Sequence, residues 1–152
     1  MNLSLRLATT VELDLLAKFN HALIRDEGHR NRMTLPQLRD RLAHWLATDY
    51  QAYLFELQTD TGPIGYTLFR TDPECLYIRQ FFIVPEYRRR GHGRQAFEQM
   101  RKNVWLSNLP LRLDVLVHNH TGIKFWHALG FADYCLTLEL PAVHDLPSEQ
   151  HP

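Results

Sequence analysis

The sequence predicts a mixed α/β fold in which helices cover a central sheet. Two amphipathic helical patterns follow a first short strand, three strand patterns come in series in the middle of the chain, and helix and strand patterns alternate after them. The length of 152 residues suits one domain with one substantial core. The expected order is β-α-α-β-β-β-α-β-α-β, which is not a regular repeat of βαβ units.

The amino-terminal part supplies the first strand and two helices. Residues 3–7 alternate leucine with polar side chains, as in a half-buried strand. Thr9 or Thr10 then offers a hydroxyl cap for a helix, and Thr34 caps a second helix. Apolar residues recur at helical spacing after both caps, so each helix has one face to bury.

The strands of the sheet come next in the chain. Residues 52–57 and 63–70 form a predicted hairpin around Gly62, and residues 75–84 form a third strand that ends before Pro85. The later expected elements are a helix from His92, a strand over 111–117, a short helix over 119–129 and a last strand over 131–140. The domain is thus expected to span residues 1–140, with 141–152 as a flexible tail.

Charge, hydropathy and cysteine content exclude several classes of protein. Basic and acidic residues both number 17, so no net charge favours binding to nucleic acid or to an anionic membrane. No segment approaches the ~20 apolar residues of a membrane span, and no signal peptide is recognisable. Cys75, Cys135 and the nine histidines lack the spacing of metal ligands. We expect a cytoplasmic protein with free thiols and no bound metal, and the prediction allows a homodimer.

The most informative segment is FFIVPEYRRRGHGRQAFEQM, in which a strand ends, an arginine-glycine loop follows and a helix begins. The first N–H groups of a helix lack intrahelical partners and lie at its positive end, so they attract phosphate oxygens. Gly91 and Gly93 remove side chains that would prevent close approach, and arginines add charged donors. The segment therefore predicts a phosphate-binding loop.

Two other interpretations of this loop exist. An isolated RRRGHG is also compatible with a solvated arginine run before a glycine turn. Gly91, Gly93 and Ala96 match the dinucleotide pattern G-x-G-x-x-A, with Asp114 located 18 residues beyond Ala96. In Rossmann folds, however, the glycines directly follow a strand and several βαβ units come after them. Here only about 60 residues remain and Asp114 lies within a predicted strand, so we disfavour that interpretation.

Two segments give the chain a resemblance to the GNAT superfamily of N-acetyltransferases. The first matches the family pattern V-x-P-x-x-[RQ]-x-x-G-x-[GA] at Ile83, Pro85, Arg88, Gly91 and Gly93. The second, NHTGIKFWHALGF over residues 119–131, resembles the family's asparagine-to-GF helix motif. Together with the order of elements, the resemblance covers residues 3–140. It implies a GNAT-like acyl-CoA N-acyltransferase fold and transfer of an acetyl group from acetyl-CoA, a co-substrate, to a primary amine.

The resemblance also assigns residues to the coenzyme. Main-chain N–H groups of Arg89 to Gly93 would hold the diphosphate. Backbone groups of Phe82 and Ile83 would pair with the pantetheine arm, in a slot where the strand QFFIV separates from LRLDV. The full set of implied coenzyme contacts is Phe82, Ile83, Arg88, Arg89, Arg90, Gly91, His92, Gly93, Arg94, Asn119 and Trp126.

The sequence departs from the family pattern where the departing thiolate receives its proton. The usual acid is a tyrosine of the downstream helix, but Trp126 stands at that position, and an indole N–H cannot transfer a proton near neutral pH. Tyr134, His127 or a bound water is the alternative acid. Each of the two side chains also has a plain structural interpretation, as a strand-face residue or an exposed helix residue.

The acceptor side departs from the pattern as well. Many family members carry a glutamate on the strand before the loop, and Arg79 stands there, either to bind a substrate carboxylate or to pair with a nearby acid. Asp26 and Glu27 are candidate bases, because the connection between the first two helices lines the acceptor site in the family. Asp114 is a further candidate, and a charged, solvated loop is the structural alternative.

The acceptor itself is left open by the sequence. A small polyamine-like molecule, an amino acid-like molecule and a peptide or protein terminus all remain possible partners. The missing tyrosine and glutamate also support a function from another class, a non-catalytic acyl-CoA binding or sensing domain.

Overall fold

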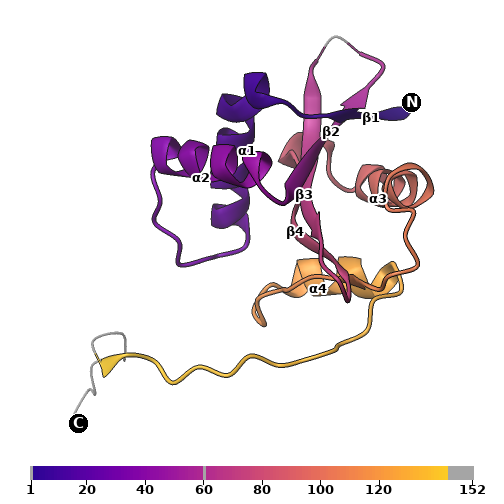
Figure 1. The fold of residues 1–152 in the computed structure, drawn as a ribbon. Coiled ribbons are helices and arrows are strands. Elements are labelled where there is room, and N and C mark those ends of the chain that lie inside the picture. Colours follow the sequence, from indigo (N-terminus) through magenta and orange to yellow (C-terminus); the bar gives the residue numbers. More distant parts are fainter. Residues whose placement is uncertain (1, 60, 144–152) are drawn as a thin grey trace.

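Five strands form one mixed sheet in the computed structural model, which describes residues 2–59 and 61–143 (Figure 1). They lie in the order β1-β2-β3-β4-β5. Neighbouring strands are antiparallel except for β4 and β5, which are parallel. The strands are β1 (Leu3–Leu7), β2 (Tyr50–Leu57), β3 (Pro63–Thr71), β4 (Leu76–Ile83) and β5 (Leu111–Arg112). The predicted mixed α/β fold is therefore confirmed.

Four helices and two short 3-10 helices accompany the strands in the described part of the chain: η1 (Thr10–Glu12), α1 (Leu13–Asp26), α2 (Leu35–Ala47), η2 (Pro85–Tyr87), α3 (His92–Asn103) and, after the last strand, α4 (His120–Ala128). Thr9 and Thr34 make capping boxes at η1 and α2, and the Asn119 side chain accepts a hydrogen bond at the start of α4. Of the two threonines predicted to cap the first helix, Thr9 is the cap, and the cap predicted at Thr34 is confirmed. No described helix is long and apolar enough to cross a membrane.

The helices cover the two faces of the sheet with separate apolar cores. On one face, α1 and α2 pack against β2, β3 and the end of β4, around the fully buried Tyr66. On the other face, α3 and the half-buried side of α4 pack around Phe97 and Met100. Figure 1 shows α1 and α2 on the side of the sheet opposite α3. The central strands therefore bury apolar side chains on both faces of the sheet, and this burial stabilises the fold.

A β-bulge at Arg79 interrupts the pairing of β3 with β4. Leu68 pairs with Gln80, and the next pair is Phe69 with Ile78, so Arg79 is an extra residue in β4. Such a bulge shifts the alternation of side chains between the two faces of a strand. Ile78 consequently belongs to the α3 core, whereas Phe82 belongs to the core under α1 and α2.

The carboxyl-terminal part differs from the sequence-based expectation. The strand expected over 111–117 is reduced to Leu111–Arg112, and residues 131–140 form no ladder with any described strand. After Gly130, which has a positive φ of 101°, the chain runs along the outside of the domain and away from it (Figure 1). An extended segment becomes a strand only with a hydrogen-bonded neighbour, and none adjoins this one. The expected tail lies mostly outside the described residues, because the description ends at residue 143.

Candidate active site

The strands β4 and β5 separate after only two paired residues. Leu76 pairs with Leu111 and Tyr77 pairs with Arg112, and no pairing follows between the rest of β4 and the residues after Arg112. From Ile78 to Ile83, β4 is therefore bonded on one side, to β3, while its other edge faces the space toward residues 113–117. This separation is the slot that the family resemblance implies for an extended ligand arm.

The arginine-glycine loop lies at the end of this slot and leads into α3. Two of its residues have positive φ angles, 60° at Arg89 and 81° at Gly91, and Gly91 is the N-cap of α3 without any side-chain cap. The first N–H group of α3 with a backbone partner is that of Gln95, which bonds to the Gly91 carbonyl. Within the described chain, the N–H groups of residues 89–94 have no backbone partner, so they are available to an anion.

The two glycines of the loop serve different purposes. A methyl group built on Gly91 would meet no atom within 4 Å, so the backbone at the start of α3 is open to a ligand. A methyl group on Gly93 would lie 3.1 Å from the ring of Phe125, so this glycine allows α3 and α4 to pack closely. The open face and the row of N–H groups fit the diphosphate of acetyl-CoA.

Arg88 connects the loop to the rest of the fold. Its Nε donates to the carbonyl of Ile83 at 2.7 Å, and its guanidinium forms an ion pair with Asp26 at the end of α1. The guanidinium also lies over the ring of Phe82, 5.4 Å from the ring centre. The side chain at the family's Arg/Gln position therefore holds β4, the loop and α1 together.

The remaining side chains of the loop have varied surroundings. Arg90 lies over the ring of Tyr87, 5.8 Å from its centre, and Arg94 donates to the carbonyl of Ala128 at 3.0 Å. His92 is buried, and its Nδ1 has no hydrogen-bond partner among the described residues. Arg89 makes no side-chain hydrogen bond or ion pair with the described residues. Arg89 is thus the loop arginine that is freest to reach a phosphate.

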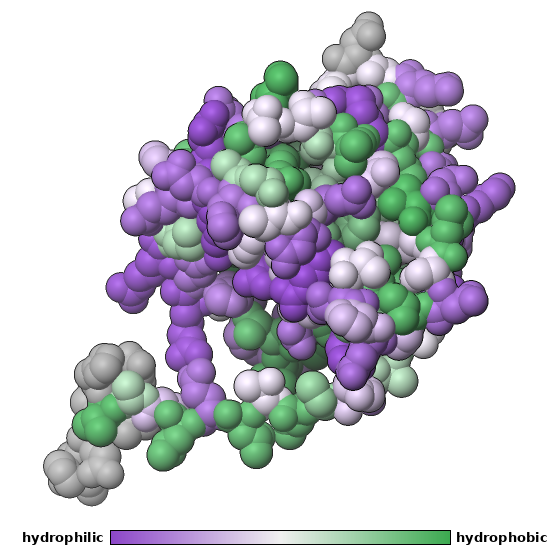
Figure 2. Space-filling view, in the orientation of Figure 1, coloured by the Kyte–Doolittle hydropathy of each residue, from purple (hydrophilic) through white to green (hydrophobic). Residues whose placement is uncertain are grey.

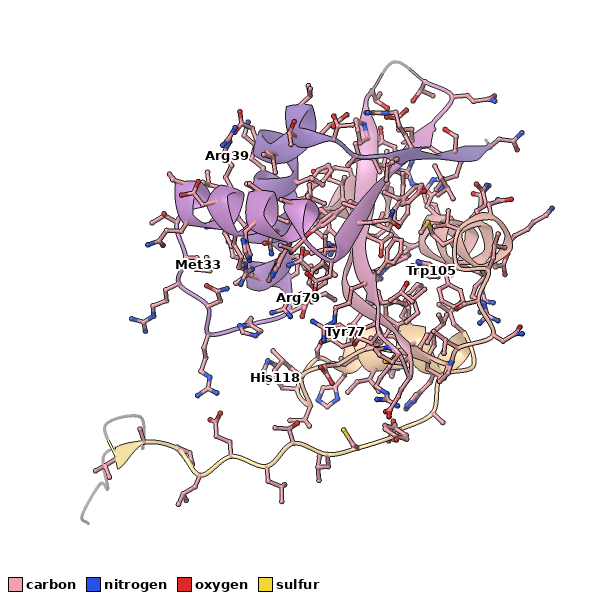
Figure 3. The ribbon with its side chains drawn as sticks, viewed as in Figure 1. Met33, Arg39, Tyr77, Arg79, Trp105 and His118 are labelled. Atoms are coloured by element: carbon pink, nitrogen blue, oxygen red, sulfur yellow. The ribbon has the colours of Figure 1, made fainter. Side chains whose placement is uncertain are left out.

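A pocket of about 50 Å³ opens where β4 and β5 separate. It brings together five residues singled out in the sequence: Glu27, Arg79, Asp114, Asn119 and Trp126. The rest of the lining is apolar: Ile78, Phe81, Leu113 and Val115. Figure 3 shows Arg79, Tyr77 and His118 in the region between α1 and α4. Asp26 and Tyr134 do not line this pocket.

The two candidate bases are placed differently. Asp26 is engaged in the ion pair with Arg88, whereas the carboxylate of Glu27 makes no hydrogen bond or ion pair with the described residues. Burial raises the pKa of Glu27, and the nearby negative charge of Asp26 raises it further. His118 fixes the main chain here, because its Nε2 bonds to the carbonyl of Glu27 at 3.1 Å. Glu27 therefore has the environment of a proton acceptor.

Arg79 projects from the bulge into a group of aromatic and basic side chains. Its guanidinium lies 4.4 Å from the ring centre of Trp45, and its Nη1 donates to the Tyr50 hydroxyl at 3.3 Å. Arg41 lies over the same indole, also at 4.4 Å. Neither guanidinium forms an ion pair with a described carboxylate. Burial, with the positive charge of Arg79, lowers the pKa of Arg41. The two uncompensated charges favour an anionic ligand.

Asp114 is held by a hydrogen bond from the opposite strand. The hydroxyl of Tyr77 donates to Asp114 Oδ2 at 2.7 Å. Burial raises the pKa of Tyr77, and the bond to the carboxylate raises it further, so the phenol stays protonated. No sequence pattern singles out Tyr77, since its contact with Asp114 depends on the parallel pairing of β4 with β5.

Asn119 and Trp126 form the α4 side of the pocket. The side-chain oxygen of Asn119 accepts a hydrogen bond from the N–H of Gly122 at 3.1 Å, which starts the helix. Trp126 packs edge-on against Phe81 and Phe131, with ring centres 5.3 and 5.2 Å apart. Its indole is thus an aromatic wall of the pocket.

The two side chains proposed as the thiolate acid lie away from the pocket. Tyr134 is 75% exposed, and the guanidinium of Arg112 lies 4.4 Å from its ring centre. His127 is exposed and its Nε2 is 2.7 Å from Asp133 Oδ1. The structure therefore does not bring either residue to the other candidates, and the role of Tyr134 stays a prediction.

A second, larger hollow of about 350 Å³ lies between the end of β1, the start of β2 and the end of α2. No carboxylate, amine or imidazole lines it, so it offers no acid-base chemistry. Within residues 2–59 and 61–143, no cluster of His, Cys, Asp and Glu is arranged to hold a metal ion.

Comparison with known proteins agrees with this fold. The model of the acetyltransferase (GNAT) family matches residues 17–131. A possible acetyltransferase from Clostridium difficile 630 has a TM-score of 0.74 at 16% identity, over 94% of this chain and 99% of that one. A predicted acetyltransferase from Clostridium acetobutylicum, solved with acetyl-CoA, has a TM-score of 0.69 at 18% identity, over 92% of this chain and 96% of that one. The aminoglycoside N-acetyltransferase AAC(6')-Iy in complex with CoA has a TM-score of 0.71 at 14% identity, over 93% of this chain and 95% of that one.

A search of curated proteins finds no match to the sequence. The fold, the open loop at the start of α3 and the slot beside β4 define a domain of the acyl-CoA-dependent transferase class. Because the family model covers more than half of its residues, the chain belongs to the acetyltransferase (GNAT) family.

Proposed function

We propose that this chain transfers an acetyl group from acetyl-CoA to the primary amine of a small, amino acid-like molecule whose carboxylate is bound at Arg79. The observation that carries the proposal is the composition of the pocket. Its lining includes two acidic residues, Glu27 and Asp114, and one basic residue, Arg79. A zwitterionic acceptor complements this arrangement, with its ammonium group toward the acids and its carboxylate toward the arginine.

The charge around Arg79 supports the carboxylate part of the proposal. Arg79 and Arg41 share the face of Trp45 and lack ion-pair partners among the described residues. Bringing a carboxylate to these guanidinium groups would relieve their mutual repulsion. The small pocket also favours a small acceptor over a long one.

In the proposed reaction, acetyl-CoA lies with its diphosphate at the start of α3 and its arm along the free edge of β4. Glu27 removes a proton from the acceptor ammonium group, directly or through one water. The neutral amine then attacks the thioester carbonyl, so that a C–N bond forms and the C–S bond breaks. Trp126 shields the reacting atoms from water and can donate a hydrogen bond. Tyr134 remains the sequence-based candidate for returning a proton to the sulfur.

Arg79→Gln tests the acceptor assignment. Release of CoA thiol from acetyl-CoA is measured with amino acids and with the amines that lack their carboxylate. For an amino acid acceptor, we expect KM to rise about tenfold or more in R79Q, since a charge-assisted bond is worth roughly 1.5–3 kcal/mol. The KM for acetyl-CoA and the rates with the matched amines should change little.

Arg70→Gln is a matched control. Arg70 also contacts the Tyr50 hydroxyl and lies over the ring of Tyr77, but it does not line the pocket. The R70Q substitution should leave the KM for the acceptor unchanged. Equal turnover of amino acids and their decarboxylated counterparts would contradict the proposed acceptor. Saturable acetyl-CoA binding without turnover of any amine would instead favour the non-catalytic acyl-CoA sensor.

A further inference from the structure

The indole of Trp45 contacts two guanidinium groups that have no acidic partner. Arg41 and Arg79 each place the guanidinium carbon 4.4 Å from the centre of this ring, so the two carbons are at most about 9 Å apart. Neither side chain forms an ion pair with a carboxylate of the described residues. The nearby Arg70, by contrast, binds both carboxylate oxygens of Asp72, at 2.9 and 3.1 Å. Two positive charges are therefore left without compensation beside Trp45.

Neutral partners hold both guanidinium groups in place. Nη1 of Arg79 donates to the hydroxyl of the buried Tyr50 at 3.3 Å. Nη2 of Arg41 donates to the side-chain oxygen of the buried Asn20 at 3.2 Å. The Nε of Arg41 is buried and has no hydrogen-bond partner among the described residues. Such partners fix the direction of a guanidinium group without cancelling its charge, and they leave most of its five N–H donors to a ligand.

Packing alone does not account for the charge of Arg41. An uncharged glutamine at this position could also pack on Trp45 and bond to Asn20. Burial lowers the pKa of Arg41, and the positive charge of Arg79 lowers it further, so the charged form is held at a cost. A half-buried charge is normally paired, because removing it from water without a partner is unfavourable. The missing negative charge is therefore expected to come from a ligand.

Arg79 connects this pair of arginines to the active-site pocket, which it lines together with Glu27 and Asp114. Hydrophilic side chains gather between α2 and α4 on the face drawn in Figure 2, and Arg79 lies in this region (Figure 3). An acceptor with one carboxylate at Arg79 would compensate one positive charge and leave Arg41 unpaired. An acceptor with two acid groups would compensate both.

We propose that the acceptor carries a second anionic group, bound by Arg41, and that the preferred acceptors are amino acids with an acidic side chain. The inference rests on the proposed function, in which Arg79 binds the main carboxylate. The spacing of the two guanidinium carbons suits two acid groups of one small molecule, because each charge-assisted hydrogen bond spans roughly 2.8 Å. A side-chain carboxylate and a side-chain phosphate share this chemistry, and the experiment separates them.

A comparison of matched acceptors tests the proposal on the wild-type chain, without any substitution. Release of CoA thiol from acetyl-CoA is measured with glutamate and glutamine, with aspartate and asparagine, and with phosphoserine and serine. We expect kcat/KM to be at least tenfold higher for the acidic member of a pair, mainly through a lower KM. A preference confined to phosphoserine would identify the second anion as a phosphate. Equal kcat/KM within all three pairs would overturn the proposal.

Arg41→Gln removes the charge and keeps a side chain that can bond to Asn20. The KM for the acidic acceptor should rise about tenfold or more, whereas the KM values for its neutral counterpart and for acetyl-CoA should change little. Arg41→Lys, which keeps the charge, should keep part of the preference. Arg39→Gln is the matched control on α2, since Arg39 pairs with the exposed Asp14 and lies apart from Arg79 (Figure 3). R39Q should leave the preference unchanged.

The outcomes separate this inference from the proposed function. Equal loss of acidic and neutral acceptors in R41Q, with a lowered melting temperature, would give Arg41 a structural role and overturn the inference. Preference for amino acids over their decarboxylated amines, with equal use of glutamate and glutamine, would overturn the second anion site alone. Turnover of amines without any turnover of amino acids would overturn both.

Discussion

The proposed role of Glu27 as base leads to a specific prediction for the pH dependence of acetyl transfer. A carboxylate base works only when ionised, and burial together with Asp26 raises the pKa of Glu27 above its usual value. Activity should therefore be full above this raised pKa and should fall tenfold per pH unit below it. Glu27→Gln removes the base, and the expected loss in kcat is about 10²- to 10⁴-fold, the usual contribution of general base catalysis.

Asp26→Asn provides a sharper version of the same test. It removes the negative charge that adds to the pKa of Glu27, so the acid limb of the pH profile should move to lower pH. Arg88 loses an ion-pair partner in this variant but keeps its bond to the Ile83 carbonyl. Asp14→Asn, which removes an exposed carboxylate paired with Arg39, is the control and should not move the limb.

The assay is thiol release at saturating acceptor, with kcat/KM for acetyl-CoA measured from acid to neutral pH. Acetyl-CoA binding should be unchanged in E27Q, since Glu27 lies in the acceptor pocket and outside the loop. Glu27 is not the base if E27Q keeps the wild-type kcat and the same acid limb. A pH profile that is identical in D26N and wild type would also count against it.

Three further predictions concern stability. Gly65→Ala should cost about 1–3 kcal/mol or more in urea unfolding, because its Cβ would lie 2.0 Å from the Phe82 carbonyl oxygen; unchanged stability would contradict this close approach. Thr9→Ala should cost about 1 kcal/mol by removing the cap, whereas Thr9→Ser should retain it. Tyr66→Phe should cost roughly 1–3 kcal/mol, because it removes the 2.6 Å hydrogen bond to Gln80 and leaves a buried oxygen unpaired.

The parts of the fold that local chemistry determines could be predicted from the sequence. Thr34 starts its helix by accepting a hydrogen bond from the N–H of a residue three positions later, which sequence spacing reveals. The loop at Gly91 combines a positive φ with an uncapped helix start, and the glycine pattern indicates both. These features are formed by residues that lie close together in the sequence.

The features that depend on pairing between distant segments could not be predicted. The bulge at Arg79 becomes visible only when β3 and β4 are aligned, and it turns Arg79 toward Trp45. The ion pair of Arg88 with Asp26 joins residues 62 positions apart and separates the two candidate bases into different roles. The strand expected at 131–140 has the right alternation, but alternation does not say which edge receives it.

Calorimetric titration of the purified chain with CoA tests the central claim, that the N–H groups of residues 89–94 bind a diphosphate. We expect saturable binding of one CoA per chain, and a loss of at least tenfold in affinity for Gly91→Val, whose side chain would project from the open start of α3 at a positive φ. Circular dichroism and thermal melting would establish that the variant is folded. Absence of saturable heat when the folded wild-type chain is titrated with CoA or acetyl-CoA would rule out a diphosphate site at residues 89–94.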